Sequence, residues 1–217
     1  MPIYVVGAGP WDPDLITLKA VKVLVKADVV YFGSLINEEI ISRYAPRARR
    51  IYMGHVRGED HERFVREAIK LAKEGLNVVF LKNGDPTIFG RGIEICREAI
   101  KEGVDCEIVP GVSSFTAAAA RYLIEFGRSI ALVAYPNLEV LGELGNVDTK
   151  VVFMSTEAIN QVLRFLRGDE ELIVISRATY PDENMVVING EVKGDLEGIK
   201  RPSIIIIRKK VVRDEGH

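Results

Sequence analysis

One stretch of the sequence combines an amide, a glycine, a carboxylate and a proline where a predicted strand gives way to a predicted helix. This stretch is Asn83-Gly84-Asp85-Pro86, which follows an apolar, β-branched run at 77–80 and precedes a helical pattern at 93–102. Gly84 lets the backbone approach a ligand closely, and Asp85 offers a carboxylate. In open α/β sheets ligands bind outside such strand ends. The turn is therefore the first candidate site, and an ordinary βα loop is the alternative.

A second glycine-containing loop lies near the start of the chain, between an apolar run at 3–6 and a helical pattern at 15–26. The loop is Gly7-Ala8-Gly9-Pro10-Trp11-Asp12, with aspartate where a dinucleotide-binding motif requires its third glycine. Pro10 also lacks the amide hydrogen that would face a phosphate. We therefore expect that a ligand here is not bound through phosphates. The alternative is a tight structural turn with Pro13 at the helix start.

The elements that position these loops alternate between strands and helices in the first half of the chain, which predicts an α/β fold with a largely parallel sheet. Strands are predicted at 3–6, 27–32, 50–53, 77–80 and 106–109, and helices at 15–26, 38–44, 61–74 and 93–102. After Pro110 few helices separate the strands, which predicts more antiparallel pairing. We place two α/β domains at 1–112 and 113–217.

Composition limits the class of protein. The chain has 217 residues, of which 47% are hydrophobic and 28% charged, with a net charge of −2. This balance suits a packed core and argues against nucleic-acid binding. No signal peptide and no membrane-spanning apolar run are recognisable, so a cytoplasmic protein is expected. The two cysteines, Cys96 and Cys106, are expected to be buried thiols in a reducing compartment.

Five motifs, taken in order, resemble those of the tetrapyrrole methylases, the class that methylates uroporphyrinogen III and the precorrins. The first covers 6–20, where Trp11 occupies a position at which the family has glycine. The other four are Gly84-Asp85-Pro86, 109–114, Val152-Phe153-Met154 and 178–183. Each motif alone is weak, but the five together span nearly the whole chain.

This resemblance implies two α/β domains with a cofactor cleft between them, the first on the tetrapyrrole side and the second on the cofactor side. It also implies a homodimer that uses S-adenosylmethionine and releases S-adenosylhomocysteine. The cofactor carries no phosphate, in agreement with the first loop. The family's cofactor contacts transfer to Pro10, Asn83, Gly84, Asp85, Ile88, Ser113, Ser114, Met154 and Ala178.

The motifs divide between two branches of the family. Phe89-Gly90-Arg91-Gly92 and 52–58 resemble uroporphyrinogen-III C-methyltransferases, yet Gly33 and His55 stand where that branch has aspartate and lysine. The segments 32–35, 103–112 and 178–183 resemble precorrin-4 C11-methyltransferases. The expected reaction is therefore C11 methylation of precorrin-4 or cobalt-precorrin-4, in corrin synthesis. The alternative is methylation of uroporphyrinogen III to precorrin-2, which also serves siroheme synthesis.

His55 is the candidate catalytic residue, because an imidazole can donate a proton near neutral pH. No metal is expected, since the three histidines show no ligand spacing with the cysteines. Two more distant alternatives remain open. One is a methylase of the same fold that acts on a substrate other than a tetrapyrrole, and the other is a non-catalytic module that keeps only the cofactor site.

Overall fold

The structure is a computed structural model that describes residues 1–54, 58–154, 156–189, 192–193 and 197–210. The chain divides into two compact units, Met1–Thr116 (unit 1) and Ala117–His217 (unit 2), each built around its own β-sheet. We describe each unit by itself.

Unit 1 contains a five-stranded sheet in which every neighbouring pair is parallel, in the order β3-β2-β4-β1-β5. The strands are β1 (Ile3–Gly7), β2 (Val29–Phe32), β3 (Arg49–Tyr52), β4 (Val78–Lys82) and β5 (Cys106–Val109). The central strands β1, β2 and β4 are apolar and almost completely buried, as expected for a sheet covered on both faces. The parallel order brings all five carboxyl ends to one edge of the sheet.

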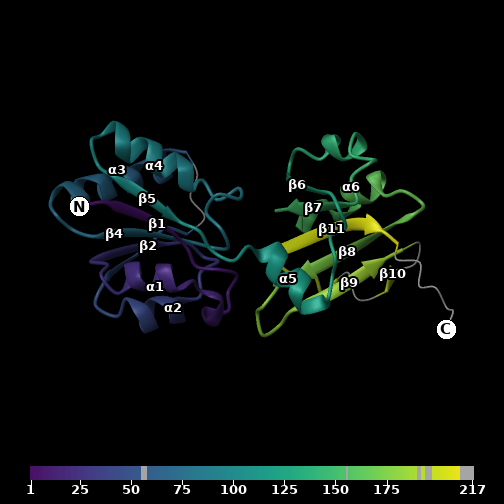
Figure 1. Cartoon of the computed structure of the whole chain (residues 1–217), viewed down its shortest axis with the longest axis horizontal. Coiled ribbons are helices and arrows are strands. Elements are labelled where there is room, and N and C mark those ends of the chain that lie inside the picture. Colours follow the sequence, from purple (N-terminus) through teal and green to yellow (C-terminus); the bar gives the residue numbers. More distant parts are fainter. Residues whose placement is uncertain (55–57, 155, 190–191, 194–196, 211–217) are drawn as a thin grey trace. The chain divides into compact units, whose positions relative to one another are not determined.

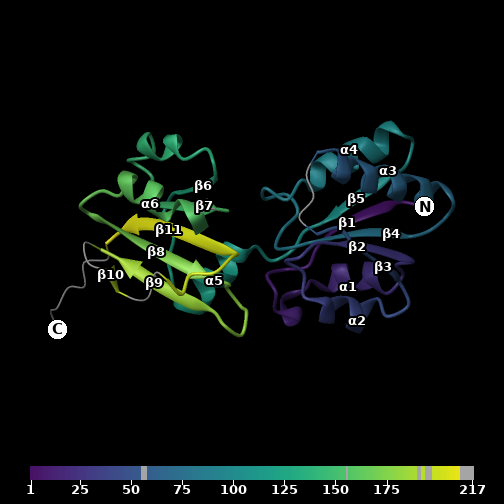
Figure 2. The same cartoon turned by 180° about the vertical axis from the view of Figure 1, so that it is seen from behind.

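Helices cover both faces of this sheet (Figures 1 and 2). The helices α1 (Leu18–Leu24) and α2 (Glu38–Tyr44) bury leucine, isoleucine and alanine against one face. The longer helices α3 (Glu59–Lys73) and α4 (Gly92–Lys101) pack against the other. Side-chain caps start the first pair, because Thr17 and Asn37 accept hydrogen bonds from backbone N–H groups of the first turn. A short 3₁₀ turn, η1 (Pro13–Leu15), follows the first loop.

Unit 2 contains a six-stranded mixed sheet in the order β10-β9-β8-β11-β7-β6. Among the strands that the structure describes in this unit, only β6 and β7 pair in parallel, so the predicted increase in antiparallel pairing is confirmed. The strands are β6 (Ile130–Ala134), β7 (Thr149–Phe153), β8 (Glu170–Ser176), β9 (Asn184–Ile188), β10 (Val192–Lys193) and β11 (Ser203–Lys209). The helical segments are α5 (Ser114–Tyr122), which begins in unit 1, η2 (Glu139–Gly142), η3 (Thr156–Ala158), α6 (Ile159–Val162) and η4 (Leu163–Phe165).

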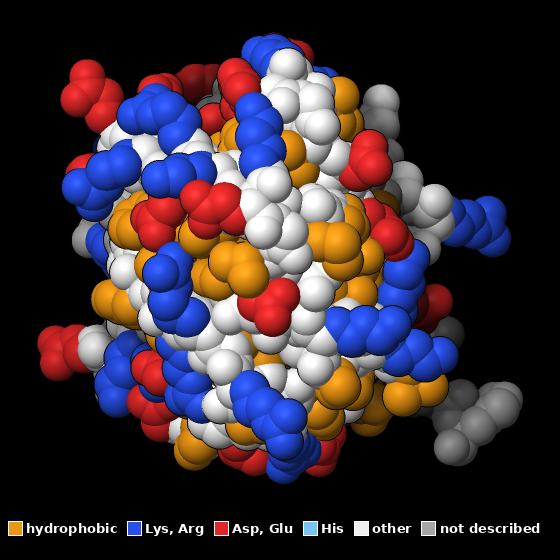
Figure 3. Space-filling model, turned by 90° about the vertical axis from the view of Figure 1, so that its left-hand side faces the viewer, with side chains coloured by type: hydrophobic (Ala, Val, Ile, Leu, Met, Phe, Trp, Pro, Cys, Tyr) orange, Lys and Arg blue, Asp and Glu red, His pale blue; other side chains and the backbone are white. Residues whose placement is uncertain are grey.

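The α/β fold class with two sheets agrees with the sequence-based prediction. The helical segment after β7 is irregular, because α6 lies between two 3₁₀ turns. Within the described residues, no helix combines the length and apolarity needed to cross a membrane. On the face of unit 1 in Figure 3, Lys and Arg side chains alternate with Asp and Glu and with hydrophobic patches.

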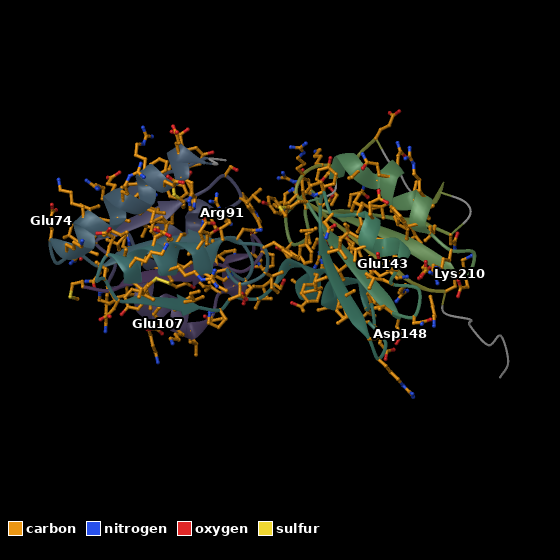
Figure 4. All side chains as sticks on the ribbon, turned by 90° about the horizontal axis from the view of Figure 1, so that it is seen from above. Glu74, Arg91, Glu107, Glu143, Asp148 and Lys210 are labelled. Atoms are coloured by element: carbon orange, nitrogen blue, oxygen red, sulfur yellow. A yellow bond between two sulfur atoms is a disulfide. The ribbon has the colours of Figure 1, made fainter. Side chains whose placement is uncertain are left out.

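The two cysteines are not free thiols, so that prediction was wrong. Cys96 of α4 and Cys106 of β5 form a disulfide, with 5.1 Å between their Cα atoms (Figure 4). No local pattern in the sequence indicates this bond, because the pairing depends on α4 packing beside β5. The bond fastens α4 to the strand that leads into the loop at Pro110.

Cys106→Ser is expected to lower the free energy of unfolding by about 2–3 kcal/mol, because the bond closes a short loop in the unfolded chain. The separation of the two cysteines is 10 residues. Denaturant titration of oxidised wild type and variant measures the difference. Reduced wild type should match the variant, and equal stability of oxidised and reduced protein would contradict the expectation.

Candidate functional site

Three loops at the carboxyl ends of β1, β4 and β5 meet through backbone contacts. A Cβ added at Gly7 would lie 2.6 Å from the Gly111 nitrogen and 2.7 Å from the Gly84 carbonyl oxygen. Gly9 and Gly84 form an antiparallel bridge, in which the Gly84 N–H donates to the Gly9 carbonyl at 2.9 Å. Gly84 itself has a φ of 65°. The approach of three backbones therefore requires glycine at positions 7 and 111.

The Asp85 carboxylate holds two of these loops together. Its Oδ1 accepts hydrogen bonds from the Thr87 N–H at 2.8 Å and from the Thr87 hydroxyl at 2.5 Å. Its Oδ2 accepts from the Gly111 N–H at 3.2 Å. Both oxygens are thus engaged inside the protein, in the turn itself and in the loop after β5. The sequence had suggested only a ligand contact for this carboxylate, which stays a prediction.

Asp85→Ala is expected to destabilise unit 1 by about 2–3 kcal/mol and to weaken S-adenosylhomocysteine binding at least tenfold. Charge-assisted hydrogen bonds contribute about 1.5–3 kcal/mol, and their loss would free the Thr87 and Gly111 amides. Calorimetric titration with S-adenosylhomocysteine measures the affinity. Asp85→Asn keeps the acceptor for Thr87 and serves as the milder control. Unchanged affinity in Asp85→Ala would contradict the role of this turn.

Backbone strain is concentrated in the same loops and in the matching loops of unit 2. Non-glycine residues rarely adopt positive φ, and strained residues of this kind are common at functional sites. Six of the seven described here lie in a motif segment or, for Arg177, directly before one, and the seventh, Leu123, follows α5. The six are Trp11 (41°), Phe89 (54°), Arg91 (57°), Met154 (57°), Arg177 (53°) and Thr179 (70°). The strain marks these loops as candidate ligand-binding segments.

A cluster of titratable groups lies beside the turn in unit 1. The Arg91 guanidinium forms a bidentate ion pair with the Glu94 carboxylate, with 2.7 Å between Nε and Oε2 and 2.5 Å between Nη2 and Oε1. Figure 4 labels Arg91. Burial, together with the positive charge of Arg91, lowers the pKa of Lys82 to about 8. Such a group can bind an anion while protonated and releases its proton near pH 8.

His61 of α3 belongs to the same cluster. Its side chain is buried, and its Nε2 has no hydrogen-bond partner among the described residues. Burial lowers the pKa of His61, and the charges of Arg91 and Lys82 add to this effect. The imidazole is therefore neutral at pH 7. Within the described residues no group of three or more His, Cys, Asp or Glu side chains is arranged to hold a metal ion.

In unit 2 the candidate residues lie at one edge of the sheet. Both β7 and β8 run antiparallel to β11, so their carboxyl ends face the same way. Met154 follows β7 and is 57% exposed, whereas Ala178 follows β8 and is buried. The Arg177 N–H donates to the Pro202 carbonyl at 2.7 Å, which ties the loop after β8 to the segment before β11.

Glu183 fixes the loop after β8. Its carboxylate accepts from the Thr179 N–H at 2.5 Å, from the Tyr122 hydroxyl at 2.7 Å and from Arg121 at 3.0 Å. Burial tends to raise the pKa of Glu183, but these donors outweigh it and lower the pKa. Burial, aided by the bond to Glu183, raises the pKa of Tyr122 to about 12. The glutamate is thus ionised at neutral pH and holds Thr179 in its strained conformation.

The structure brings seven of the predicted cofactor residues to the carboxyl edge of the sheet in unit 1. They follow β1, β4 and β5: Pro10, Asn83, Gly84, Asp85, Ile88, Ser113 and Ser114. Met154 and Ala178 lie in unit 2. His55, the predicted catalytic residue, lies outside the described residues. The assignment of these residues to the cofactor and to catalysis stays a prediction.

Sequence reasoning missed Lys82, His61 and Glu94. Lys82 directly follows the apolar strand and precedes the candidate turn, a position that could have marked it. Glu94 stands three residues after Arg91 at a helix start, which is ion-pair spacing. The burial of His61 could not be predicted, because the sequence shows only that this residue lies in a helix with a regular apolar face.

The whole arrangement resembles known proteins. Residues 2–192 match the profile of the Tetrapyrrole (Corrin/Porphyrin) Methylases. A uroporphyrinogen-III C-methyltransferase of Priestia megaterium is 41% identical over 234 residues, covering 96% of this chain and 98% of that protein.

Two solved structures give the same result. A cobalt precorrin-4 methyltransferase has a TM-score of 0.82 and 31% identity, covering 95% of this chain and 94% of its own. A uroporphyrin-III C-methyltransferase of Thermus thermophilus, complexed with S-adenosylhomocysteine, has a TM-score of 0.74 and 31% identity, covering 96% and 97%. With these matches across both units, the chain belongs to the tetrapyrrole methylase family, whose members transfer a methyl group from S-adenosylmethionine.

Proposed function

We propose that this tetrapyrrole C-methyltransferase acts at C11 of precorrin-4 or cobalt-precorrin-4. The observation that supports this choice is the packing of Gly33, at the end of β2. A Cβ at this position would lie 3.1 Å from the Gly54 carbonyl oxygen, which is tighter than normal contact. The aspartate of the uroporphyrinogen branch would therefore need a shift of the neighbouring loop. Asp182 and Glu183 belong to the segment 178–183, which resembles the precorrin-4 branch. Both side chains hold their loop in place, because Asp182 accepts a hydrogen bond from Arg177 and Glu183 accepts one from the Thr179 N–H.

The residues present suit S-adenosylmethionine. The loops after β1, β4 and β5 offer backbone groups and small polar side chains, and Pro10 has no amide hydrogen to donate to a phosphate. We assign Pro10, Asn83, Gly84, Asp85, Ile88, Ser113 and Ser114 of unit 1, and Met154 and Ala178 of unit 2, to cofactor binding. The bound cofactor supplies an activated methyl group. The protein's part is to hold donor and acceptor in line and to manage a proton on the macrocycle.

We assign Lys82 and Arg91 to one carboxylate group of the macrocycle. A carboxylate is the partner that a guanidinium group prefers, and Arg91 already pairs with one such group, the carboxylate of Glu94. Affinity for the macrocycle is expected to fall as pH rises through about 8, because Lys82 then loses its proton.

Arg91→Leu removes a positive neighbour, so the pKa of Lys82 should rise and the pH dependence should move to higher pH, with weaker binding overall. Binding titrations of the macrocycle between about pH 7 and pH 10 measure both effects. Lys101→Leu, which removes an exposed cation elsewhere on α4, is the control. An unmoved midpoint in Arg91→Leu would contradict the coupling of the two cations.

A second candidate is methylation of uroporphyrinogen III. It is favoured by the loop 89–92, which resembles the same loop in that branch. The conformation of this loop requires glycine at positions 90 and 92. A Cβ at Gly90 would lie 2.8 Å from the Pro86 carbonyl oxygen, and one at Gly92 would lie 2.8 Å from the Pro86 Cβ. The 41% identical relative points the same way.

Mass spectrometry decides between the two candidates. The protein is incubated with S-adenosylmethionine and either macrocycle, and each product is tested for added methyl groups. Methylation of precorrin-4 or its cobalt form supports the first proposal, and methylation of uroporphyrinogen III alone overturns it in favour of the second. If S-adenosylhomocysteine binds but neither macrocycle is methylated, both proposals fail. We also expect a homodimer, as the family resemblance implies.

A further inference from the structure

The Cys96–Cys106 disulfide closes a ring of chain that contains two of the candidate ligand loops. From Asp85 the chain runs through the loop 86–91 into α4, where Cys96 lies. The disulfide crosses from there to Cys106 at the start of β5, the strand that leads to Gly111. The hydrogen bond from the Gly111 N–H to Asp85 Oδ2, at 3.2 Å, completes the ring. The ring therefore includes the turn after β4 and the beginning of the loop after β5.

The start of α4 is packed against the turn that holds Asp85. α4 begins at Gly92, whose N–H donates to the Pro86 carbonyl oxygen at 3.2 Å. A Cβ at Gly92 would lie 2.8 Å from the Pro86 Cβ and 3.1 Å from a methyl group of Val5. The helix start thus lies directly on the residue that follows Asp85. A shift of α4 is therefore expected to move Pro86 and, with it, the Asp85 carboxylate.

On the other side of the ring, the disulfide restrains β5. This strand lies at the edge of the sheet and, within the described residues, pairs with β1 alone. Of its four residues only Val109 is buried. A strand with one hydrogen-bonded neighbour and few buried side chains has low local stability. Loss of the disulfide is therefore expected to loosen β5 together with the loop that carries Gly111.

A dithiol reductant can open this bond by thiol–disulfide exchange. A thiolate of the reductant attacks one sulfur of the pair to form a mixed disulfide, and its second thiol then displaces that sulfur. The reductant becomes a disulfide, while Cys96 and Cys106 each gain one electron and one proton. Cys106 is only partly buried and lies on an outer strand, whereas Cys96 is 7% exposed. The side of the pair on β5 is thus the less protected one.

We propose that the Cys96–Cys106 pair is a redox switch for cofactor binding. The disulfide holds the loops after β4 and β5 in the arrangement that binds the cofactor, and reduction loosens them and weakens binding. This inference rests on our assignment of these loops to S-adenosylmethionine. Because coupling between two sites is reciprocal, a ligand that prefers the oxidised protein also makes the disulfide harder to reduce. A tenfold preference corresponds to a reduction potential about 30 mV more negative.

Calorimetric titration of S-adenosylhomocysteine into the oxidised and the dithiol-reduced full chain tests the proposal. We expect five- to tenfold weaker binding after reduction. The double variant Cys96→Ser, Cys106→Ser is the matched control, which should bind as weakly as reduced wild type and should not respond to the dithiol. Circular dichroism verifies that each form is folded, and alkylation of free thiols followed by mass spectrometry verifies its redox state.

Equilibration in dithiol redox buffers tests the reciprocal effect. Saturating S-adenosylhomocysteine should move the midpoint of reduction of wild type to more reducing buffers, as measured by thiol alkylation. Equal affinity of the folded oxidised and reduced protein, or an unmoved midpoint, overturns the proposal and leaves the disulfide as a structural crosslink only.

Titration of Asp85→Ala separates this failure from a failure of the loop assignment. If Asp85→Ala weakens S-adenosylhomocysteine binding and reduction does not, the loops bind the cofactor but the disulfide does not control them. If neither change weakens binding, the assignment of the loops is wrong, and the proposal of a switch is wrong with it. These readouts are independent of whether the chain methylates either macrocycle.

Discussion

Glu170→Leu is expected to lower the free energy of unfolding by about 3–5 kcal/mol, which is the usual cost of leaving one charge of a buried ion pair without its partner. Lys150 of β7 and Glu170 of β8 form an ion pair in which each side chain is only 2% exposed. Glu170 also accepts a hydrogen bond from the Arg167 N–H at 3.1 Å. The variant leaves the Lys150 ammonium buried next to a hydrocarbon. Urea titration followed by circular dichroism measures the loss.

The double variant Lys150→Met, Glu170→Leu is the informative control. Replacing both members of a buried pair by apolar residues of similar size is often neutral or stabilising. Most of the stability lost in Glu170→Leu should therefore return. If the double variant were as unstable as the single one, the loss would come from packing or from the Arg167 contact, and the electrostatic explanation would be wrong. Binding of S-adenosylhomocysteine to folded protein should change little in the double variant.

Gly111→Ala is expected to reduce S-adenosylhomocysteine affinity by about two orders of magnitude and to destabilise unit 1 by about 1–3 kcal/mol, the usual range for overpacking. A Cβ at this position would overlap the Gly84 carbonyl oxygen and lie 2.9 Å from the Gly7 Cα. The overlap cannot be relieved by moving a flexible side chain, because the three nearest atoms all belong to the backbone. The loop after β5 would have to move away from the loops after β1 and β4, and the cofactor contacts we assign to these loops would separate with it.

Calorimetric titration and thermal unfolding measure these two effects. Gly142→Ala is the matched control, since its Cβ would meet Phe165 at an ordinary 3.8 Å. It should leave both affinity and stability within experimental error. Wild-type affinity in Gly111→Ala would show that the convergence of the three backbones is not needed for cofactor binding.

Much of unit 1 could be predicted from the sequence because local signals there agree. Apolar β-branched runs alternate with amphipathic helical patterns, and the turn at Gly84-Asp85-Pro86 falls between one of each. The first loop and the turn at Gly84 were predicted as candidate ligand sites, and both belong to the three loops that converge. The order of the strands could not be predicted in this way, since it depends on contacts between distant segments.

Contacts between distant residues account for what was missed. The Cys96–Cys106 bond, the Lys150–Glu170 pair and the Asp85–Gly111 hydrogen bond each join two different elements. The periodicity and the local spacing of residues in the sequence cannot predict contacts of this kind. The role of Asp85 illustrates the limit well, because the sequence placed this residue at the site while only the structure reveals that its carboxylate holds two loops together.

The position of β11 has a consequence for synthesis of the protein. All five strands of unit 1 are complete by Val109, so this unit can fold while the ribosome is still translating the rest. In unit 2 the last strand, Ser203–Lys209, lies between β7 and β8, which do not pair with each other. The sheet of unit 2 therefore cannot be completed until β11 has been synthesised. A premature stop codon before residue 203 would leave a finished first unit joined to a sheet without its centre, which is a natural substrate for proteases.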